Sequence, residues 1–291
     1  MKKQSRSLIE IHIAVFLFGF SALFGKLITL SPTAIVFGRT SFATLALLIF
    51  LLYSKQNFKL KSKKDFLFLF SVGFIYAFHW YSFFKSVQIS NVAIAVLTFS
   101  TYPIFVTFLE PYFFNEKIRT FDIISALVTL FGVLLVVPKF ELTNNFTQGA
   151  LWGIAAGFSC ALLAIACKVS VAKYSSIVVS FYQNLATAII SIPLIILIKP
   201  VFEVKNLFLL AVLGILFTAI SGTLYIKSLS NIKVQLASII TCLEPVYAII
   251  FAAIFLKEVP STKTIFGGLI ILGAIISATL KSKSITIVPE H

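Results

Sequence analysis

The strongest constraint on the fold is a succession of ten long apolar runs that are separated by short polar connections. Each run has about 20 residues, the length that an α-helix needs to cross roughly 30 Å of hydrocarbon. The predicted helices span residues 8–29, 33–53, 65–85, 91–113, 120–138, 147–168, 175–198, 206–227, 234–256 and 263–280. We therefore predict an all-α membrane protein with ten transmembrane helices, in which consecutive helices are antiparallel.

The composition argues against the main classes of soluble protein. Of the 291 residues, 59% are hydrophobic and 12% are charged, whereas soluble proteins carry roughly twice that charged fraction. Lys and Arg lie mostly in the short gaps between apolar runs, so the net charge of +14 does not indicate a nucleic-acid partner. Cys160, Cys167 and Cys242 form no disulfide or metal-binding pattern. We expect no cofactor and no metal, and the expected partners are the lipid bilayer and a small-molecule substrate.

The basic residues also predict the orientation in the membrane. With a cytoplasmic N-terminus, sixteen Lys and Arg residues fall on the inner side and seven on the outer side. Basic residues near membrane helices are enriched on the cytoplasmic side. We therefore expect an integral protein of the bacterial cytoplasmic (inner) membrane with both termini, including the tail 282–291, in the cytoplasm.

The two halves of the chain share unusual residues at one offset of 142 positions. The aligned residues are Phe84-Lys85-Ser86 with Ile226-Lys227-Ser228, Pro103 with Pro245, Glu116 with Glu258, and Lys26 with Lys168. This pattern predicts two five-helix repeats, residues 1–140 and 147–281. Because five is odd, the second repeat would enter the bilayer from the opposite side. Such inverted-topology repeats are typical of transporters that work by alternating access.

The aligned prolines, Pro103 and Pro245, lie inside the fourth and ninth predicted helices. Proline removes one backbone N–H donor and clashes with the carbonyl four residues earlier. The freed backbone groups must face protein or a wet cavity, because lipid offers no hydrogen bonds. The pair of breaks therefore favours a central binding cavity. A simple kink, with its carbonyl bonded by a neighbouring Ser or Thr, is the alternative.

Glu244 lies near the middle of the ninth predicted helix. A carboxylate there costs on the order of 2.5–3.5 kcal/mol on insertion scales. It would bind an amine or another cation, take up a proton during transport, or pair with a basic side chain as a structural element. Tyr102 is its equivalent in the first repeat. Thr241, Tyr247 and Phe251 share its predicted helical face.

The third predicted helix carries Tyr76, His79, Trp80 and Phe83 at positions i, i+3, i+4 and i+7, which form one face. Such a face would line a cavity, with His79 as a proton relay and the aromatic rings holding an amphipathic ligand or its cation. The alternative is an aromatic packing stripe, or an interfacial belt, in which His79 bonds to a neighbour.

Arg39 lies in the second predicted helix, near its outer end. It would bind a carboxylate or a lipid phosphate, or pair with an internal acid. We favour structural pairing, because an arginine cannot be neutralised cheaply.

A stripe of small residues, Gly149, Gly153 and Gly157, recurs every four positions in the sixth predicted helix. Small residues at this spacing let another backbone approach closely. We interpret the stripe as a helix-packing surface.

These motifs resemble those of the ten-helix EamA-type permeases of the drug/metabolite transporter superfamily, over essentially the full chain. The matching stretches are Phe18-Gly19, Lys26, Pro32, Arg39, Lys85-Ser86-Val87, Pro103, Glu116, Lys227-Ser228-Leu229, Glu244-Pro245-Val246 and Glu258. The resemblance implies a secondary transporter, often an exporter of amino acids or other small metabolites, with a cavity between its two halves.

Two other functional classes fit the sequence less well. A membrane-embedded enzyme, such as a lipid-modifying transferase, would carry a recognisable catalytic motif, and the sequence has neither His-Glu-x-x-His nor Gly-x-Ser-x-Gly. A channel or lipid scramblase would need a continuous polar path, and the polar residues are too sparse to draw one. The sequence therefore favours a transporter, with possible proton coupling through Glu244 or His79.

Overall fold

The computed structural model describes residues 2–114, 120–137 and 141–281, in which every regular element is a helix. The predicted tail 282–291 and Glu116 lie outside the described residues. The helices of the first half are α1 (Lys2–Leu27), α2 (Pro32–Tyr53), α3 (Lys63–Ile89), α4 (Val92–Phe99), α5 (Tyr102–Phe114) and α6 (Thr120–Val136). Those of the second half are α7 (Asn145–Val171), α8 (Ser176–Ile198), α9 (Val204–Gly214), η1 (Ile215–Ile220), α10 (Ser221–Ser228), α11 (Val234–Thr241), α12 (Glu244–Phe251), η2 (Ala252–Leu256) and α13 (Thr262–Lys281).

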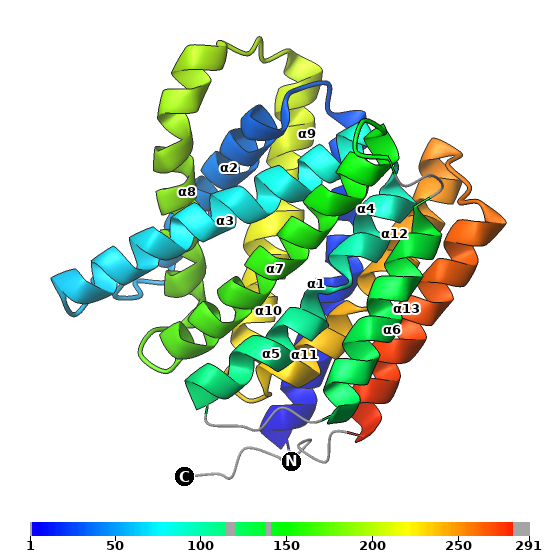
Figure 1. Cartoon of the computed structure of the whole chain (residues 1–291). Coiled ribbons are helices and arrows are strands. Elements are labelled where there is room, and N and C mark those ends of the chain that lie inside the picture. Colours follow the sequence, from blue (N-terminus) through cyan, green and yellow to red (C-terminus); the bar gives the residue numbers. More distant parts are fainter. Residues whose placement is uncertain (1, 115–119, 138–140, 282–291) are drawn as a thin grey trace.

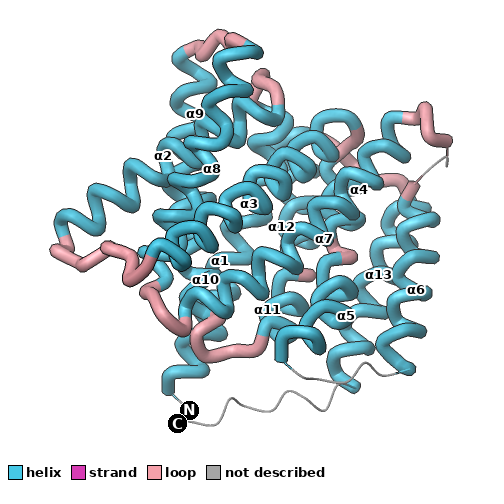
Figure 2. Tube along the Cα trace, turned by 60° about the vertical axis from the view of Figure 1, so that its left-hand side comes forward, coloured by secondary structure: helices cyan, strands magenta, loops and turns pink. Residues whose placement is uncertain are grey.

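Apolar membrane-length segments dominate the described part of the chain. Eight segments there are long and apolar enough to cross a membrane, with α4–α5, α9–α10 and α11–η2 each counted as one. Two shorter apolar helices, Ile123–Val136 and Thr262–Ala274, belong to α6 and α13. These two lie side by side at one edge of the molecule (Figures 1 and 2). The chain is an all-helical integral membrane protein.

The helix breaks predicted from the prolines are present at equivalent positions. One separates α4 from α5 and the other separates α11 from α12, and Pro103 and Pro245 are each the second residue after the break. At the first break the α-helical hydrogen-bond pattern gives way to a bond between residues three positions apart, in which the Thr101 N–H donates to the Thr98 carbonyl at 3.2 Å. Such bonds between residues three positions apart are typical of helix ends. Each proline therefore begins a new helix, where its missing N–H costs least.

Equivalent helices of the two halves pack against each other in antiparallel pairs. In the broken pair, α4 contacts α12 and α5 contacts α11 (Figure 1). In the pair α6 and α13, Gly132 lies against Ile271 while the Thr264 hydroxyl donates to the Val136 carbonyl at 3.4 Å. The residue numbers rise in one helix as they fall in the other, which defines the antiparallel direction. The two helix breaks therefore belong to two helices that pack directly against each other.

The first helix of each half packs mainly on the other half. Helix α1 lies against α10, α12 and α11, whereas α7 lies against α3, α4 and α5. We refer to α1, α10, α11 and α12 as the α1 group and to α3, α4, α5 and α7 as the α7 group. The boundary between the two groups, called the seam below, runs through the centre of the bundle.

The small-residue stripe on α7 is a packing surface, as predicted. Gly149 faces Ser90 at the end of α3, Gly153 faces α4, and Gly157 faces the break between α4 and α5. A Cβ atom added at Gly157 would lie 2.9 Å from the Phe99 carbonyl oxygen. Because that oxygen belongs to the backbone, it cannot move aside like a flexible side chain. The stripe therefore allows α7 to approach the broken helix closely.

This close approach predicts that Gly157→Ala destabilises the fold. Overpacking of a tight contact costs roughly 1–3 kcal/mol, so we expect a lower thermal unfolding midpoint in detergent. The matched control is Gly273→Ala in α13, where an added Cβ has no neighbour within 4 Å. Equal midpoints for both variants would contradict the packing role of Gly157.

Candidate functional site

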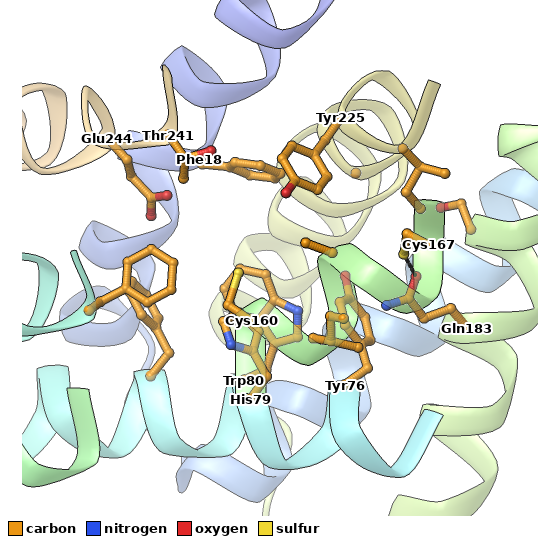
Figure 3. A pocket seen from close by; sticks show the side chains of 17 residues that line it. Phe18, Tyr76, His79, Trp80, Cys160, Cys167, Gln183, Tyr225, Thr241 and Glu244 are labelled. Atoms are coloured by element: carbon orange, nitrogen blue, oxygen red, sulfur yellow. Dashed lines mark hydrogen bonds between the residues drawn. The ribbon is translucent and has the colours of Figure 1, made fainter. Parts of the chain in front are cut away.

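A cavity lies along the seam (Figure 3). The α1 group contributes Phe18, Gly222, Tyr225, Ile226, Thr241 and Glu244. The α7 group contributes Tyr76, His79, Trp80, Phe83, Phe99, Cys160, Leu163, Ala164 and Cys167, and α8 adds Ser180 and Gln183. Residues on both helix breaks therefore reach the same space.

All four residues of the predicted aromatic face on α3 line the cavity. The rings of His79 and Trp80 meet edge to face at 4.8 Å between centroids. The Nδ1 atom of His79 lies 2.9 Å from the Ala156 carbonyl oxygen of α7 and donates to it as an N–H. His79 thus faces the cavity and is also held by a neighbouring helix.

Glu244 is the first residue of α12, and its carboxylate points into the cavity. Among the lining residues it is the single acid, and none of them is Lys or Arg. The Thr241 hydroxyl donates to the Ala237 carbonyl at 2.9 Å. Within the described part of the chain, no side chain forms a hydrogen bond or ion pair with Glu244, which is only 4% exposed. The buried Arg39 attracts this carboxylate without touching it. A buried carboxylate without a direct partner is stabilised further by a proton or by a cationic ligand.

Tyr102 lies behind the cavity wall and contacts a lining residue across the seam. Its hydroxyl is 2.9 Å from the hydroxyl of Tyr225 on α10, and its ring stacks on Phe99. Because Tyr102 belongs to the α7 group and Tyr225 to the α1 group, this hydrogen bond joins the two groups beside the cavity. Tyr102 therefore positions the wall and does not itself line the space.

Arg39 is fully buried behind Trp80. Its guanidinium carbon lies 3.4 Å from the centre of the Trp80 ring. Its Nε donates to the Thr218 hydroxyl at 2.9 Å, and its Nη2 donates to the Phe217 carbonyl at 3.3 Å. Both acceptors belong to η1, a π-helical segment, a form that often occurs at functional sites. The sequence suggested an internal acid as the partner of Arg39. Glu244 does attract the guanidinium electrostatically, but the direct contacts of Arg39 are with an aromatic ring and a helix irregularity.

Two predicted residues of the Glu244 face, Tyr247 and Phe251, do not line the cavity. Both pack on α1, with ring centres 5.3 Å and 5.6 Å from that of Phe16. Tyr247 follows Glu244 by three positions on the same helix α12. Side chains three positions apart diverge by about 60° around a helix, which is enough to turn Tyr247 from the cavity to α1.

Several lining residues were not singled out as binding candidates from the sequence, among them Phe18, Phe99, Cys160, Gln183 and Tyr225. The signal for most of them is the same offset of 142 that relates the prolines. Lining residues at that offset are Phe18 with Cys160, Trp80 with Gly222, Phe83 with Tyr225, and Phe99 with Thr241. Extending the repeat from the shared polar residues to the apolar ones would have found them.

The position of Arg39 predicts that Arg39→Lys lowers stability although it keeps the charge. A lysine loses the planar stacking on Trp80, and a desolvated cation–π contact contributes roughly 2 kcal/mol. The expected result is a lower unfolding midpoint in detergent. The control is Arg6→Lys, because the Arg6 side chain is 74% exposed. An unchanged midpoint for Arg39→Lys would show that stacking contributes little.

Several known proteins similar to this chain are transporters by name. The chain is 28% identical over 259 residues to the uncharacterized transporter YxxF of Bacillus subtilis, covering 87% of this chain and 83% of the relative. It is 28% identical to an S-adenosylmethionine uptake transporter of Rickettsia bellii, and the match covers 82% of this chain and 81% of the relative. A crystal structure matches the fold with a TM-score of 0.72 at 18% identity, covering 95% of this chain and 97% of the other.

The family comparison agrees with these relatives. The model of the EamA-like transporter family matches residues 6–137 and, a second time, residues 147–280. Together the two matches cover most of the described helices. The chain belongs to the EamA-like transporter family.

Proposed function

We propose that this transporter moves small organic solutes that carry an amine across the bacterial cytoplasmic membrane by alternating access. Amino acids and related metabolites are the proposed substrates, and export is the proposed direction. The observation that carries the proposal is the buried Glu244 carboxylate, which faces a central cavity and forms no direct hydrogen bond or ion pair with the described residues.

The cavity wall suits a substrate with a cationic group and an apolar body. Aromatic faces attract ammonium groups, and Tyr76, Trp80 and Phe99 surround the space from the α7 group. Gln183 and Tyr225 add hydrogen-bonding groups at the edge. Glu244 would pair with the amine of the substrate. In the empty cavity the same carboxylate would hold a proton, so that exchange of proton for amine couples transport to the proton gradient.

The proposed mechanism uses ten membrane helices in two inverted repeats, residues 1–140 and 147–281. Three observations support it: the equivalent helix breaks, the antiparallel packing of equivalent helices, and the cavity residues that recur at an offset of 142. In this arrangement one mouth opens while the equivalent contacts close the other. Both termini would lie in the cytoplasm, as the basic residues predict.

Relatives from Rickettsia bellii and Rickettsia felis are named S-adenosylmethionine uptake transporters. That compound joins an amino-acid group to a sulfonium cation, so it has the charge that Glu244 would recognise. It therefore belongs in the test panel beside amino acids, and transport is measured in both directions.

Replacing the carboxylate is expected to abolish transport. In proteoliposomes, Glu244→Gln should reduce flux of the transported amine to the level of empty liposomes, because an amide cannot pair with a cation or exchange a proton. The matched control is Glu203→Gln, which changes an exposed acid before α9 and should retain flux.

Full flux in folded Glu244→Gln would remove the carboxylate from the site. Loss of flux in both Gln variants would point instead to a general effect of charge. Acidification of the vesicle lumen during substrate efflux would separate proton coupling from simple facilitated movement.

The inverted repeat predicts opposite accessibility for equivalent residues. Cysteines placed at Lys85 and Lys227, which are 142 positions apart, should react with a membrane-impermeant thiol reagent from opposite sides of the membrane. Right-side-out and inside-out vesicles provide the two measurements. Reaction of both cysteines from one side would contradict the proposed topology.

A further inference from the structure

Lys26 and Lys168 occupy equivalent positions in the two halves and bind equivalent backbone groups. The Lys26 ammonium donates to the Ser90 carbonyl at 2.8 Å. The Lys168 ammonium donates to the Ile232 carbonyl at 3.0 Å and to the Leu229 carbonyl at 2.5 Å. Ser90 and Ile232 are themselves 142 positions apart. The same contact is therefore made twice.

Both contacts cross the seam. Lys26 lies at the end of α1, whereas Ser90 connects α3 to α4 in the α7 group. Lys168 lies near the end of α7, whereas Ile232 connects α10 to α11 in the α1 group. By contrast, Lys227 binds Glu10 at 2.6 Å within the α1 group. The two equivalent lysines thus hold together the surfaces between which the cavity lies.

The two contacts lie at opposite ends of the bundle. Helix α4 begins at the end where α1 finishes, and α11 begins at the end where α1 starts (Figure 1). Each lysine follows one of the equivalent cavity residues, Phe18 or Cys160, by eight positions, a rise of about 12 Å along a helix. On α7 the lining continues to Cys167, so Lys168 lies directly beyond the last lining residue of its helix. Each contact is therefore placed between the cavity and one mouth of the seam.

A third residue, Glu258, takes part in the contact at the Lys26 end of the bundle. One carboxylate oxygen of Glu258 accepts the Val92 N–H at 3.1 Å, and the other lies 4.0 Å from the Lys26 ammonium. Val92 begins α4, and Glu258 follows η2. The carboxylate therefore adds a second link across the seam at this end, beside the positive end of the α4 dipole.

We infer that Lys26 and Lys168 are the gate residues of the two mouths. This inference rests on the proposed alternating access. Release of Lys26 from Ser90 would open one mouth while Lys168 keeps the other closed, and the reverse would complete the cycle. When a mouth opens, water takes the place of the backbone carbonyl as the hydrogen-bond partner of the lysine. Opening therefore costs only the net free energy of one charged hydrogen bond. The alternative is that each lysine merely balances the dipole of its helix end, and that role predicts no effect confined to one side.

The native cysteines provide the test. Cys160 lines the cavity, whereas Cys242 is buried outside the lining. A membrane-impermeant thiol reagent is applied to right-side-out and inside-out vesicles, and modification of each cysteine is measured by peptide mass spectrometry. With a cytoplasmic N-terminus, Lys26→Met should raise modification of Cys160 from outside by about tenfold. This is the increase expected when one charged hydrogen bond that keeps the mouth closed is removed. Lys168→Met should raise it from inside by a similar factor.

The matched control is Lys227→Met, which removes an ion pair within one group and should leave Cys160 as protected as in the unmodified protein. Modification of Cys242 reports unfolding. If a Met variant shows modified Cys242, the corresponding Gln variant, Lys26→Gln or Lys168→Gln, takes its place in the same assay. No increase at Cys160 in either folded gate variant, or an increase from the same side in both, would overturn the inference. The assay uses no substrate, so its outcome is independent of the flux measured for Glu244→Gln.

Discussion

The arrangement of this protein depends on two interruptions of helical backbone inside a lipid environment. Lipid cannot replace the hydrogen bonds that a proline removes, so each interruption must be covered by protein or face a hydrated space. Here the breaks before Pro103 and Pro245 do both. Gly157 of α7 lies against the backbone of the first break, and Glu244 at the second faces the cavity. Close helix packing and the candidate binding site are thus two responses to the same constraint.

The breaks also explain why the two halves of the cavity differ chemically. Equivalent positions carry Phe99 and Thr241 at one level, and Tyr102 and Glu244 at the next. Tyr102 closes its side through a hydrogen bond to Tyr225, whereas Glu244 leaves its side open to a ligand. A symmetric backbone can therefore hold an asymmetric site. This asymmetry places the single carboxyl group of the lining on one side of the cavity.

Much of the fold was predictable from the sequence, because membrane length, proline and small-residue spacing act locally. The helix breaks, the aromatic face on α3 and the packing role of Gly157 followed from such local rules. The surroundings of Arg39 were not predictable, since its partners Trp80 and Thr218 lie on other helices and depend on tertiary packing. Tyr247 packs on α1 and not on the cavity, because residues three positions apart diverge by about 60° around a helix. Helix spacing therefore predicted which residues lie near the cavity, but which neighbour each side chain contacts depends on the packing of other helices.

The exchange of first helices between the halves has a consequence for biosynthesis. Helix α1 emerges first from the ribosome, but most of its partners, α10 and α12, belong to the last third of the chain. Chains are synthesised at about 5–20 residues per second, so α1 must wait in the bilayer for many seconds before it can bury its inner face. Neither half alone contains a complete set of neighbours for its own first helix. Assembly is therefore a late event that joins both halves at once, and a chain truncated before α10 would leave α1 without its native neighbours.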